Sequence, residues 1–259
     1  MNDINKVRDF YDTQVQQINC LDEVCGSEFL PVYLRSPYLF VEEYLQNKIK
    51  SYGRDLKLLD LCCGTGVHAV RYAQLGYIVS GVDISSVSIE KAKNLAKKFK
   101  VVEKLDFTVQ EIDQKLNFSD ESFDVVFISG SLYYLDYEKI MPEILRVLKR
   151  GGTFACIETN GDNFIMNFVR KIKNIFLRHR DQQTIIGLLR FRDVEKILLS
   201  FLSVRLVYFD FFTMASYFFV WNKWLLKKWL KLAIVLDEFL LNKLGLRIFC
   251  FKFVIIGEK

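Results

Sequence analysis

The stretch LLDLCCGTGVHA, residues 58–69, decides the fold of this chain. An apolar run enters the turn Gly64-Thr65-Gly66, and a helical pattern follows over residues 67–75 until Gly76 ends it. Glycine tolerates positive φ and lets a ligand approach the backbone closely. The stretch therefore predicts a buried strand, a tight turn and a helix whose first turn can face a ligand.

The same alternation continues on both sides of this stretch. Residues 77–82 form an apolar run that ends at Asp83, and Ser85 or Ser86 can cap a helix running to about residue 98. Further strands are expected at 107–110, 123–129 and 153–158, with helices at 38–50, 137–149 and 193–201, and Gly151-Gly152 is expected to break the chain before residue 153. Alternating strands and helices predict a parallel sheet covered on both faces.

Asp83 lies where a ligand of such a sheet is expected. Open α/β sheets bind ligands at the carboxyl ends of their strands, and a carboxylate about twenty residues after the glycine turn can accept hydrogen bonds from both ribose hydroxyls. The chain lacks the third glycine of the dinucleotide fingerprint and has no G-x-x-x-x-G-K-[ST] motif. The missing G-x-x-x-x-G-K-[ST] motif argues against a P-loop nucleotide site.

Composition limits the protein class. The chain has 259 residues, of which 51% are hydrophobic and 26% charged, so it can bury a full core, and general disorder is excluded. No long uncharged apolar stretch and no apolar leader are found, which predicts a cytoplasmic protein without a transmembrane helix or signal peptide. Six cysteines without a C-x-x-C pair, and only two histidines, predict no metal site.

Positive charge gathers in the last third of the chain. Residues 161–259 contain 17 Lys and Arg against 8 Asp and Glu, a net charge of +9, although the whole chain carries only +5. Such a region suits an anionic substrate, a nucleic acid or a membrane surface, or it is simply a solvated cationic face.

Residues 55–160 resemble the class I S-adenosylmethionine-dependent methyltransferases. The resemblance rests on four ordered segments: LLDLCCGTG at 58–66, VSGVDIS at 79–85, NFSDESFDVVF at 117–127 and EILRVLKRGGTF at 143–154. It implies an α/β, Rossmann-like, doubly wound seven-stranded sheet whose last strand is antiparallel, with helical cap insertions. Residues 204–212 and 248–256 would be its final two strands.

The resemblance also implies S-adenosyl-L-methionine as cofactor and assigns its contacts. Gly64 and Gly66 would lie along its methionine part, Asp60 would meet its ammonium group, Asp83 would hold the ribose and Ile84 would pack on the adenine. Ile112 stands where the family often has Asp, so Asp113 or Glu111 would take the contact to the adenine amino group. Ser129 would complete the set of cofactor contacts.

The loop after the fourth strand would face the methyl group. It reads Ser129-Gly130-Ser131-Leu132-Tyr133-Tyr134. We expect Tyr133 to orient the substrate, although a tyrosine with a pKa near 10 is a poor base and the ring could be only a pocket wall. Tyr134 is a further substrate candidate. The Asn/Asp-Pro-Pro-aromatic motif of nucleic-acid amino methyltransferases is absent from this loop, so nucleic acid is an improbable substrate.

Other substrate candidates lie outside the four segments. Tyr11, within Phe10-Tyr11-Asp12, resembles a family opening that closes over the cofactor. Arg178 and His179 belong to a basic cluster with Arg170, Lys171, Lys173 and Arg180, which could grip a phosphate or carboxylate or be a solvated helix face. His68 is a candidate base, but a histidine satisfied at a helix start is the stronger expectation.

We predict one methyltransferase domain over residues 1–259. Its parts would be an N-terminal helical cap (1–50), a cofactor-binding core (51–160), cap insertions (161–190 and 213–247) and the final helix and strands of the core (191–212 and 248–259). A segment as long as 213–247 exceeds a hairpin loop and must form an added element.

Residues 221–240 read as an amphipathic helix. Helical spacing puts Trp221, Trp224, Leu225, Leu232, Leu236 and Phe239 on one face, with Lys223, Lys227 and Lys231 on another. This pattern favours a cap over the substrate pocket; peripheral membrane contact and self-association stay open.

These observations predict an S-adenosylmethionine-dependent methyltransferase acting on O or N of a small amphiphilic or anionic metabolite. Two rivals remain: an RNA methyltransferase, favoured only by the basic C-terminal part, and a non-catalytic cofactor-binding or membrane-associated partner protein. The sequence indicates no oligomeric state.

Overall fold

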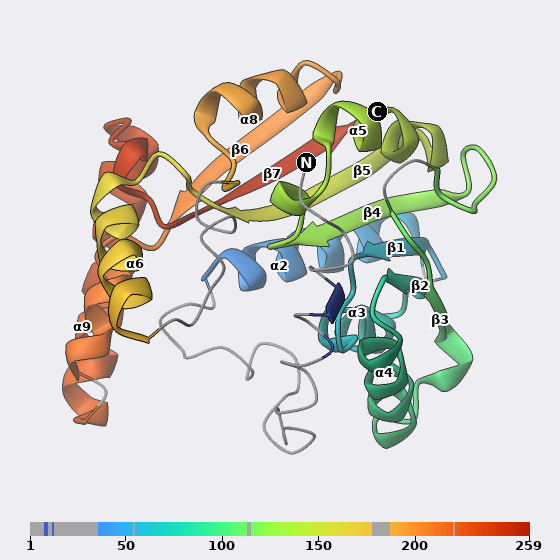
Figure 1. Cartoon of the computed structure of the whole chain (residues 1–259), viewed down its shortest axis with the longest axis horizontal. Coiled ribbons are helices and arrows are strands. Elements are labelled where there is room, and N and C mark those ends of the chain that lie inside the picture. The colour runs from blue at the N-terminus through green and yellow to red at the C-terminus, as the bar shows by residue number, and fades with distance from the viewer. Residues whose placement is uncertain are drawn as a thin grey trace.

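A computed structural model describes residues 8–9, 12, 36–53, 55–112, 115–177, 187–219 and 221–259. Its centre is one seven-stranded sheet in the order β3-β2-β1-β4-β5-β7-β6, of which β7 alone runs antiparallel, between β5 and β6 (Figure 1). The strands are β1 (Lys57–Leu61), β2 (Ile78–Asp83), β3 (Leu105–Val109), β4 (Phe123–Ser129), β5 (Leu148–Thr159), β6 (Ser203–Phe209) and β7 (Lys252–Glu258). The expected doubly wound sheet with an antiparallel last strand is confirmed.

Helices cover both faces of the sheet. One face packs on α2 (Ser36–Tyr52), α3 (Val67–Leu75) and α4 (Ser86–Lys98), and the other packs on α5 (Tyr137–Val147) and α8 (Phe191–Leu198). Alternating strand residues such as Leu58 and Leu59 enter the two separate cores, because successive side chains point to opposite faces. The strand order reverses between β1 and β4, which puts the loops after these strands beside one crevice.

The glycines of the first turn have different roles. Gly66 has φ +76°, and a Cβ there would lie 2.7 Å from Ala92 Cβ and 2.9 Å from the Phe107 ring, so its lack of a side chain lets α3 pack against α4 and β3. Gly64 has φ +51° and faces open space. Within this turn, Gly64 is therefore the position that leaves room for a ligand.

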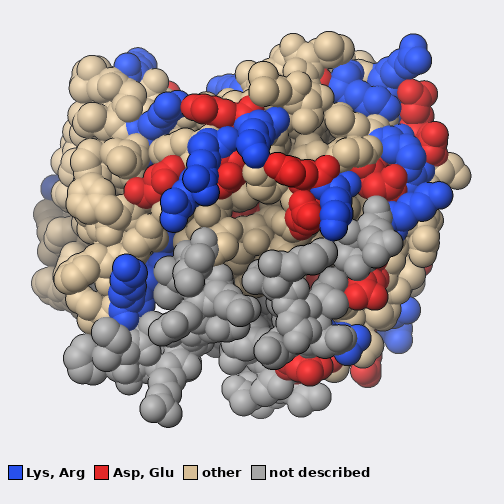
Figure 2. Space-filling view, turned by 45° about the horizontal axis from the view of Figure 1, so that its top comes forward, with Lys and Arg blue, Asp and Glu red and all other residues tan. Residues whose placement is uncertain are grey.

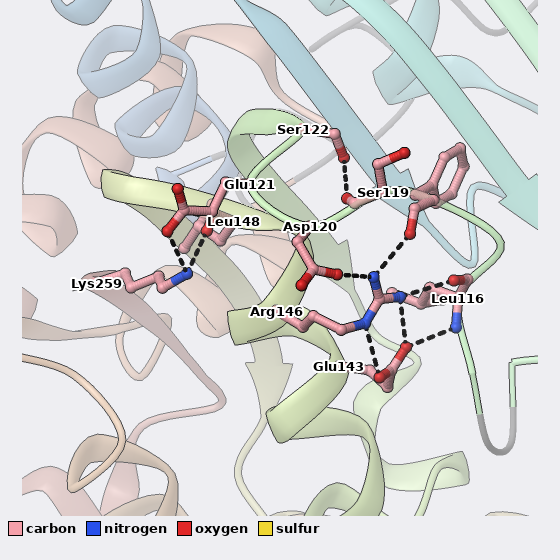
Figure 3. Close-up of polar contacts among 10 residues, drawn as sticks. Leu116, Ser119, Asp120, Glu121, Ser122, Glu143, Arg146, Leu148 and Lys259 are labelled. Atoms are coloured by element: carbon pink, nitrogen blue, oxygen red, sulfur yellow. Dashed lines mark hydrogen bonds and ion pairs between the residues drawn. The ribbon is translucent and has the colours of Figure 1, made fainter.

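Arg146 ties together the third and fourth family-like segments (Figure 3). Its guanidinium donates to the carbonyl oxygens of Leu116 (2.8 Å) and Phe118 (2.7 Å) and to the carboxylates of Asp120 and Glu143. Glu143 in turn accepts the Leu116 N–H at 2.9 Å. The network fixes the loop before β4 onto α5, so these motif residues support the fold rather than the chemistry.

The predicted break at Gly151-Gly152 is wrong. β5 runs through both glycines, and its pairing with β4 skips from Leu148 to Thr153. Gly151, at φ +70°, absorbs the irregularity, while its N–H and the carbonyl of Gly152 bond to Lys259 at the end of the last strand. A glycine pair here makes a bulge because a neighbouring strand supplies its backbone partners.

The 213–247 insertion folds mainly as α9 (Lys223–Asp237) followed by a π-helical segment, Glu238–Lys243. Asp237 accepts the N–H groups of Phe211, Phe212 and Thr213 at 3.1, 2.7 and 3.2 Å, which fastens α9 to the turn after β6. Asn242 bonds both the N–H and the carbonyl of Tyr208, pairing with the outer edge of β6. The insertion is thus anchored by specific polar contacts.

The structure shows which side of α9 packs against the protein, a point that helical spacing alone left open. Leu230, Ala233 and Asp237 are its buried residues, with Leu241 in the π-helical segment. Most of the residues predicted to form its apolar face, Trp221, Trp224, Leu232 and Phe239, are exposed. The small Ala233 and the capping carboxylate of Asp237 determine the orientation, and side-chain hydrophobicity alone does not reveal this.

In the part of the chain that the structure describes, no helix combines the length and the apolar character needed to cross a bilayer.

Candidate functional site

The carboxyl ends of β1 and β2 bring Asp60, Asp83 and Gly64 together. Asp83 accepts the Gly64 N–H at 2.8 Å with one oxygen and the Ser85 N–H at 2.9 Å with the other. These bonds orient the carboxylate beside the glycine turn, and carboxylate oxygens can each accept more than one hydrogen bond. The side chain of Ser85, one of the two expected caps, accepts the Ser88 N–H and starts α4.

Asp60 is a buried carboxyl group with an unused hydrogen-bond acceptor. Burial, and then the charge of Asp83, raise the pKa of Asp60 to about 8, although the Ala69 N–H offsets part of this shift. Its Oδ2 atom is buried and has no hydrogen-bond partner among the described residues. A buried carboxylate oxygen in this state is costly unless a cationic group joins it.

A second buried carboxylate lies at the end of β5. Glu158 accepts the N–H groups of Ser131 and Leu132 at 2.9 and 2.7 Å through Oε1, which fixes the loop after β4. Its Oε2 atom is buried and has no partner within the described residues. Burial raises the pKa of Glu158 to about 7 against the opposing effect of these backbone donors.

The predicted substrate loop follows β4 at the sheet's switch point. Tyr133 and Tyr134 lie in a single 3-10 turn, with ring centroids 4.1 Å apart, and both are half-buried. The Tyr133 ring also packs against the core on the α5 side. Gly130, at φ +63°, faces open space beside them. The turn therefore offers an aromatic surface at the edge where the methyl group was expected.

Two residues from distant parts of the chain, Tyr38 and Lys252, lie beside this loop, and sequence reasoning missed both. The Tyr38 hydroxyl accepts a bond from Lys252 Nζ at 2.8 Å and lies 3.3 Å from Ser129 Oγ. The Tyr38 ring stacks on His68 with centroids 5.0 Å apart. Because Tyr38 lies in α2 and Lys252 begins β7, no local motif links them.

His68 is a poor candidate for a general base. Burial and the positive charge of Lys252 lower the pKa of His68 to about 4. The imidazole is therefore neutral at pH 7 but weakly basic, and its ring is enclosed by Tyr38 and Phe127. This environment agrees with the expectation of a packed histidine at a helix start.

The other residues predicted to contact the cofactor or substrate differ in burial, and some lie outside the described residues. Ile84 is half-buried directly after β2, Ile112 is buried in the core and Glu111 is exposed. Tyr11, Asp113, Arg178 and His179 lie outside the described residues. Asp12, next to Tyr11, accepts a hydrogen bond from the Ser85 hydroxyl, so this point of the N-terminal segment reaches the end of β2.

The carboxylates at this edge of the sheet fit the positive charge of S-adenosylmethionine, which carries an ammonium and a sulfonium group. Two buried carboxylate oxygens at this edge, Asp60 Oδ2 and Glu158 Oε2, lack partners among the described residues, and Gly64 leaves open space above its backbone. Positive groups nearby would relieve the cost of these buried carboxylates. The chemistry of the site therefore suits a cationic cofactor.

Comparison with known proteins identifies the core. A profile of the family described as "Methyltransferase domain" matches residues 59–156. Residues 59–156 are a class I S-adenosylmethionine-dependent methyltransferase domain. S-adenosylmethionine is the cofactor of this domain family, as the resemblance implied.

Curated relatives match this chain over only part of its length. A demethylmenaquinone methyltransferase of Leptospira interrogans is 33% identical over 131 residues, covering 49% of each chain. The sterol 24-C-methyltransferase of Saccharomyces cerevisiae is 36% identical over 119 residues, covering 45% of this chain and 30% of the yeast protein. The chain thus spans about half, or less, of these relatives.

Solved structures share the fold over nearly the whole chain. Geranyl diphosphate C-methyltransferase from Streptomyces coelicolor superposes with a TM-score of 0.63 at 15% identity, covering 98% of this chain and 96% of that one. The [4+2]-cyclase SpnF reaches a TM-score of 0.57 at 17% identity, covering 98% and 95%. At such identities the likeness concerns the fold alone.

The raised pKa of Asp60 predicts pH-linked cofactor binding. Below pH 8 this carboxyl group is largely protonated in the free protein, and a bound ammonium favours its ionised form. Affinity for the demethylated product, S-adenosylhomocysteine, should therefore rise as pH increases towards 8, with release of about one proton at neutral pH. Calorimetry in two buffers of different ionisation enthalpy measures this release.

Asp60→Asn is the matched variant for this linkage, because it retains the shape of the side chain and removes its titration. It should bind more weakly and release fewer protons than the wild type. Equal proton release by the two proteins would show that Asp60 is not the linked group.

Proposed function

We propose that this protein is an S-adenosylmethionine-dependent methyltransferase that modifies a small amphiphilic metabolite. The observation that carries the proposal is the pair of carboxylates, Asp60 and Asp83, at the ends of neighbouring strands beside the Gly64 turn. The pair stands at the carboxyl edge of the sheet, where ligands of this fold bind.

The residues at this edge have separate tasks in the proposed reaction. Asp83 holds the ribose, while Asp60 and Glu158 balance positive charge in a buried setting. The cofactor supplies an activated methyl group on a sulfonium. The chain must then orient the acceptor in line with that group, and Tyr133 stands in the loop suited to this positioning.

We first propose that the atom accepting the methyl group is oxygen or nitrogen. Tyr133 can orient a hydroxyl or amine by hydrogen bonding, although it is not a strong base. Carbon is the second candidate, because two similar proteins are named for methylation at carbon: the yeast sterol 24-C-methyltransferase and geranyl diphosphate C-methyltransferase. The named menaquinone, sterol and isoprenoid activities also support an amphiphilic acceptor.

Transfer of isotopically labelled methyl from S-adenosylmethionine tests this function. The protein is incubated with organic-soluble metabolites, or with total RNA, from the cells that contain it. We expect label in the organic fraction, and mass spectrometry of the product then separates O-, N- and C-methylation. Tyr133→Phe should retain cofactor binding and lose turnover if the hydroxyl orients the acceptor.

Two results would overturn the proposal. Label in RNA instead of the organic fraction would establish the RNA methyltransferase. Tight cofactor binding with label in neither fraction would establish a protein that binds the cofactor without methyl transfer, as the shared fold of a cyclase permits.

A further inference from the structure

An unusual number of large apolar side chains are exposed on α6 (Phe164–Leu177), on α9 and in the turn before α9. Trp221 is 76% exposed, and Phe168 is 65% exposed. The exposed set comprises Phe164, Phe168 and Ile172 of α6, Phe218 and Trp221 of the turn, and Trp224, Leu232 and Val235 of α9 with Phe239 just beyond it. Single exposed leucines are common, but gathered aromatic residues mark an interaction surface. We call this set the α6–α9 surface.

The charge of the α6–α9 surface is positive. Trp224, Lys228, Lys231 and Val235 follow each other along one exposed side of α9, at helical spacing. Lys228 Nζ lies 3.8 Å from the centroid of the Trp224 ring. α6 contains no acidic residue, and in α9 the one carboxylate, Asp237, is turned inward to the 211–213 backbone. Just beyond α9, beside Phe239, Glu238 is exposed and accepts a hydrogen bond from Asn242. Lys227, Lys228 and Lys231 outnumber this acid, so the surface combines apolar side chains with a net positive charge.

We propose that the α6–α9 surface docks on an anionic phospholipid bilayer. Tryptophan, phenylalanine and leucine enter the boundary between headgroups and acyl chains, while lysines meet anionic headgroups with their charged ends. A second copy of this chain is a poorer occupant, because an isologous contact would bring the two lysine rows together. The described helices are too short or too polar to span a bilayer, so docking is peripheral.

The position of the α6–α9 surface relates membrane docking to the candidate active site. α6 follows β5, and α9 follows β6 through a short 3-10 segment, so both helices leave the carboxyl edge of the sheet. Figure 1 shows the two helices at the same end of the molecule, and Figure 2 shows a broad area of uncharged residues at that end. Docking would turn the edge that contains Asp60 and Asp83 towards the source of an amphiphilic substrate. The docking itself does not depend on methyl transfer.

Co-sedimentation of the full chain with lipid vesicles tests the proposal. The probes are vesicles of phosphatidylcholine alone and of phosphatidylcholine mixed with phosphatidylglycerol. We expect binding to the anionic vesicles, weaker binding to the neutral ones, and release as salt is raised. The double variant Trp221→Gln/Trp224→Gln should bind at least about tenfold more weakly, because each buried tryptophan contributes a large apolar area.

Two further variants separate charge from apolar contact. Lys227→Gln/Lys228→Gln/Lys231→Gln should bind more weakly and lose most of the salt dependence. Leu199→Gln/Leu202→Gln is the matched control: both leucines are highly exposed, but they lie before β6, at the opposite edge of the sheet, so binding should not change.

Quenching of the wild-type tryptophans by brominated lipid gives a readout that requires no variant. Quenching on anionic vesicles is expected, because Trp221 and Trp224 would lie at acyl-chain depth. Absence of vesicle binding, or equal binding by the tryptophan variant, would overturn the proposal. So would a dimer in size-exclusion chromatography that the tryptophan variant abolishes while vesicles do not bind. Cofactor binding measured without vesicles reports separately on the proposed function.

Discussion

Asp83→Ala should weaken the binding of S-adenosylhomocysteine by about 1.5–3 kcal/mol, which is roughly 10- to 150-fold. The variant removes a charged acceptor expected to hold the ribose. It also removes the bonds that fix the Gly64 and Ser85 N–H groups, so the glycine turn loses its anchor. Titration calorimetry measures the affinity directly.

Asp106→Ala is the matched control for this variant, because Asp106 is an exposed aspartate on the neighbouring strand β3. Its affinity should equal that of the wild type. Unchanged affinity in Asp83→Ala would remove the ribose assignment, and a loss shared by both variants would indicate a general electrostatic effect.

Asp237→Ala should lower the free energy of unfolding by about 3–5 kcal/mol. The carboxylate accepts three backbone N–H groups at 211–213 and the Thr213 hydroxyl at 3.0 Å. Alanine would leave the three N–H groups without their acceptor, and Thr213 is buried, while the Thr213 hydroxyl keeps Asp210 Oδ1 as an acceptor at 3.0 Å. Each unsatisfied buried donor costs about 1–3 kcal/mol, and the half-buried donors recover part of this by bonding water.

Urea unfolding measures the loss, and limited proteolysis reports whether α9 detaches before the rest. Lys231→Ala, on the exposed face of the same helix, should change stability by less than about 0.5 kcal/mol. If Asp237→Ala is as stable and as protease-resistant as Lys231→Ala, Asp237 does not anchor the insertion.

Local sequence is sufficient to predict the fold and the site where both come from one strand–turn–helix unit. The helix at residues 67–75 and the strand at 123–129 have the expected bounds, and Asp60, Asp83 and Gly64 gather at one edge as expected. The elements and the site depend on residues close together in the chain. Hydrophobic periodicity and the glycine positions are therefore enough to predict them.

Residues brought together by tertiary structure could not be found in this way. Tyr38 and Lys252 are 214 positions apart, and their contact exists only because β7 enters the sheet between β5 and β6. Glu158 is visible in the sequence as a strand end, but its bonds to the 131–132 backbone depend on the β4–β5 register.

The orientation of α9 could not be predicted for a related reason. Amphipathic periodicity groups the apolar residues on one face without saying what that face contacts. The backbone donors at 211–213 turn Asp237 inward and leave Trp221 and Trp224 exposed. A polar anchor outweighs apolar patterning when it supplies the acceptor for a buried donor such as the Thr213 N–H.

A crystal structure of the protein with S-adenosylhomocysteine bound tests the central claim most directly. We expect the ribose hydroxyls within hydrogen-bond distance of the Asp83 carboxylate, the amino group near Asp60, and the sulfur facing the 129–134 loop with the Tyr133 ring on its open side. A ligand bound away from the carboxyl ends of β1 and β2, or a Tyr133 ring on the opposite face of the sheet from the sulfur, would contradict the account.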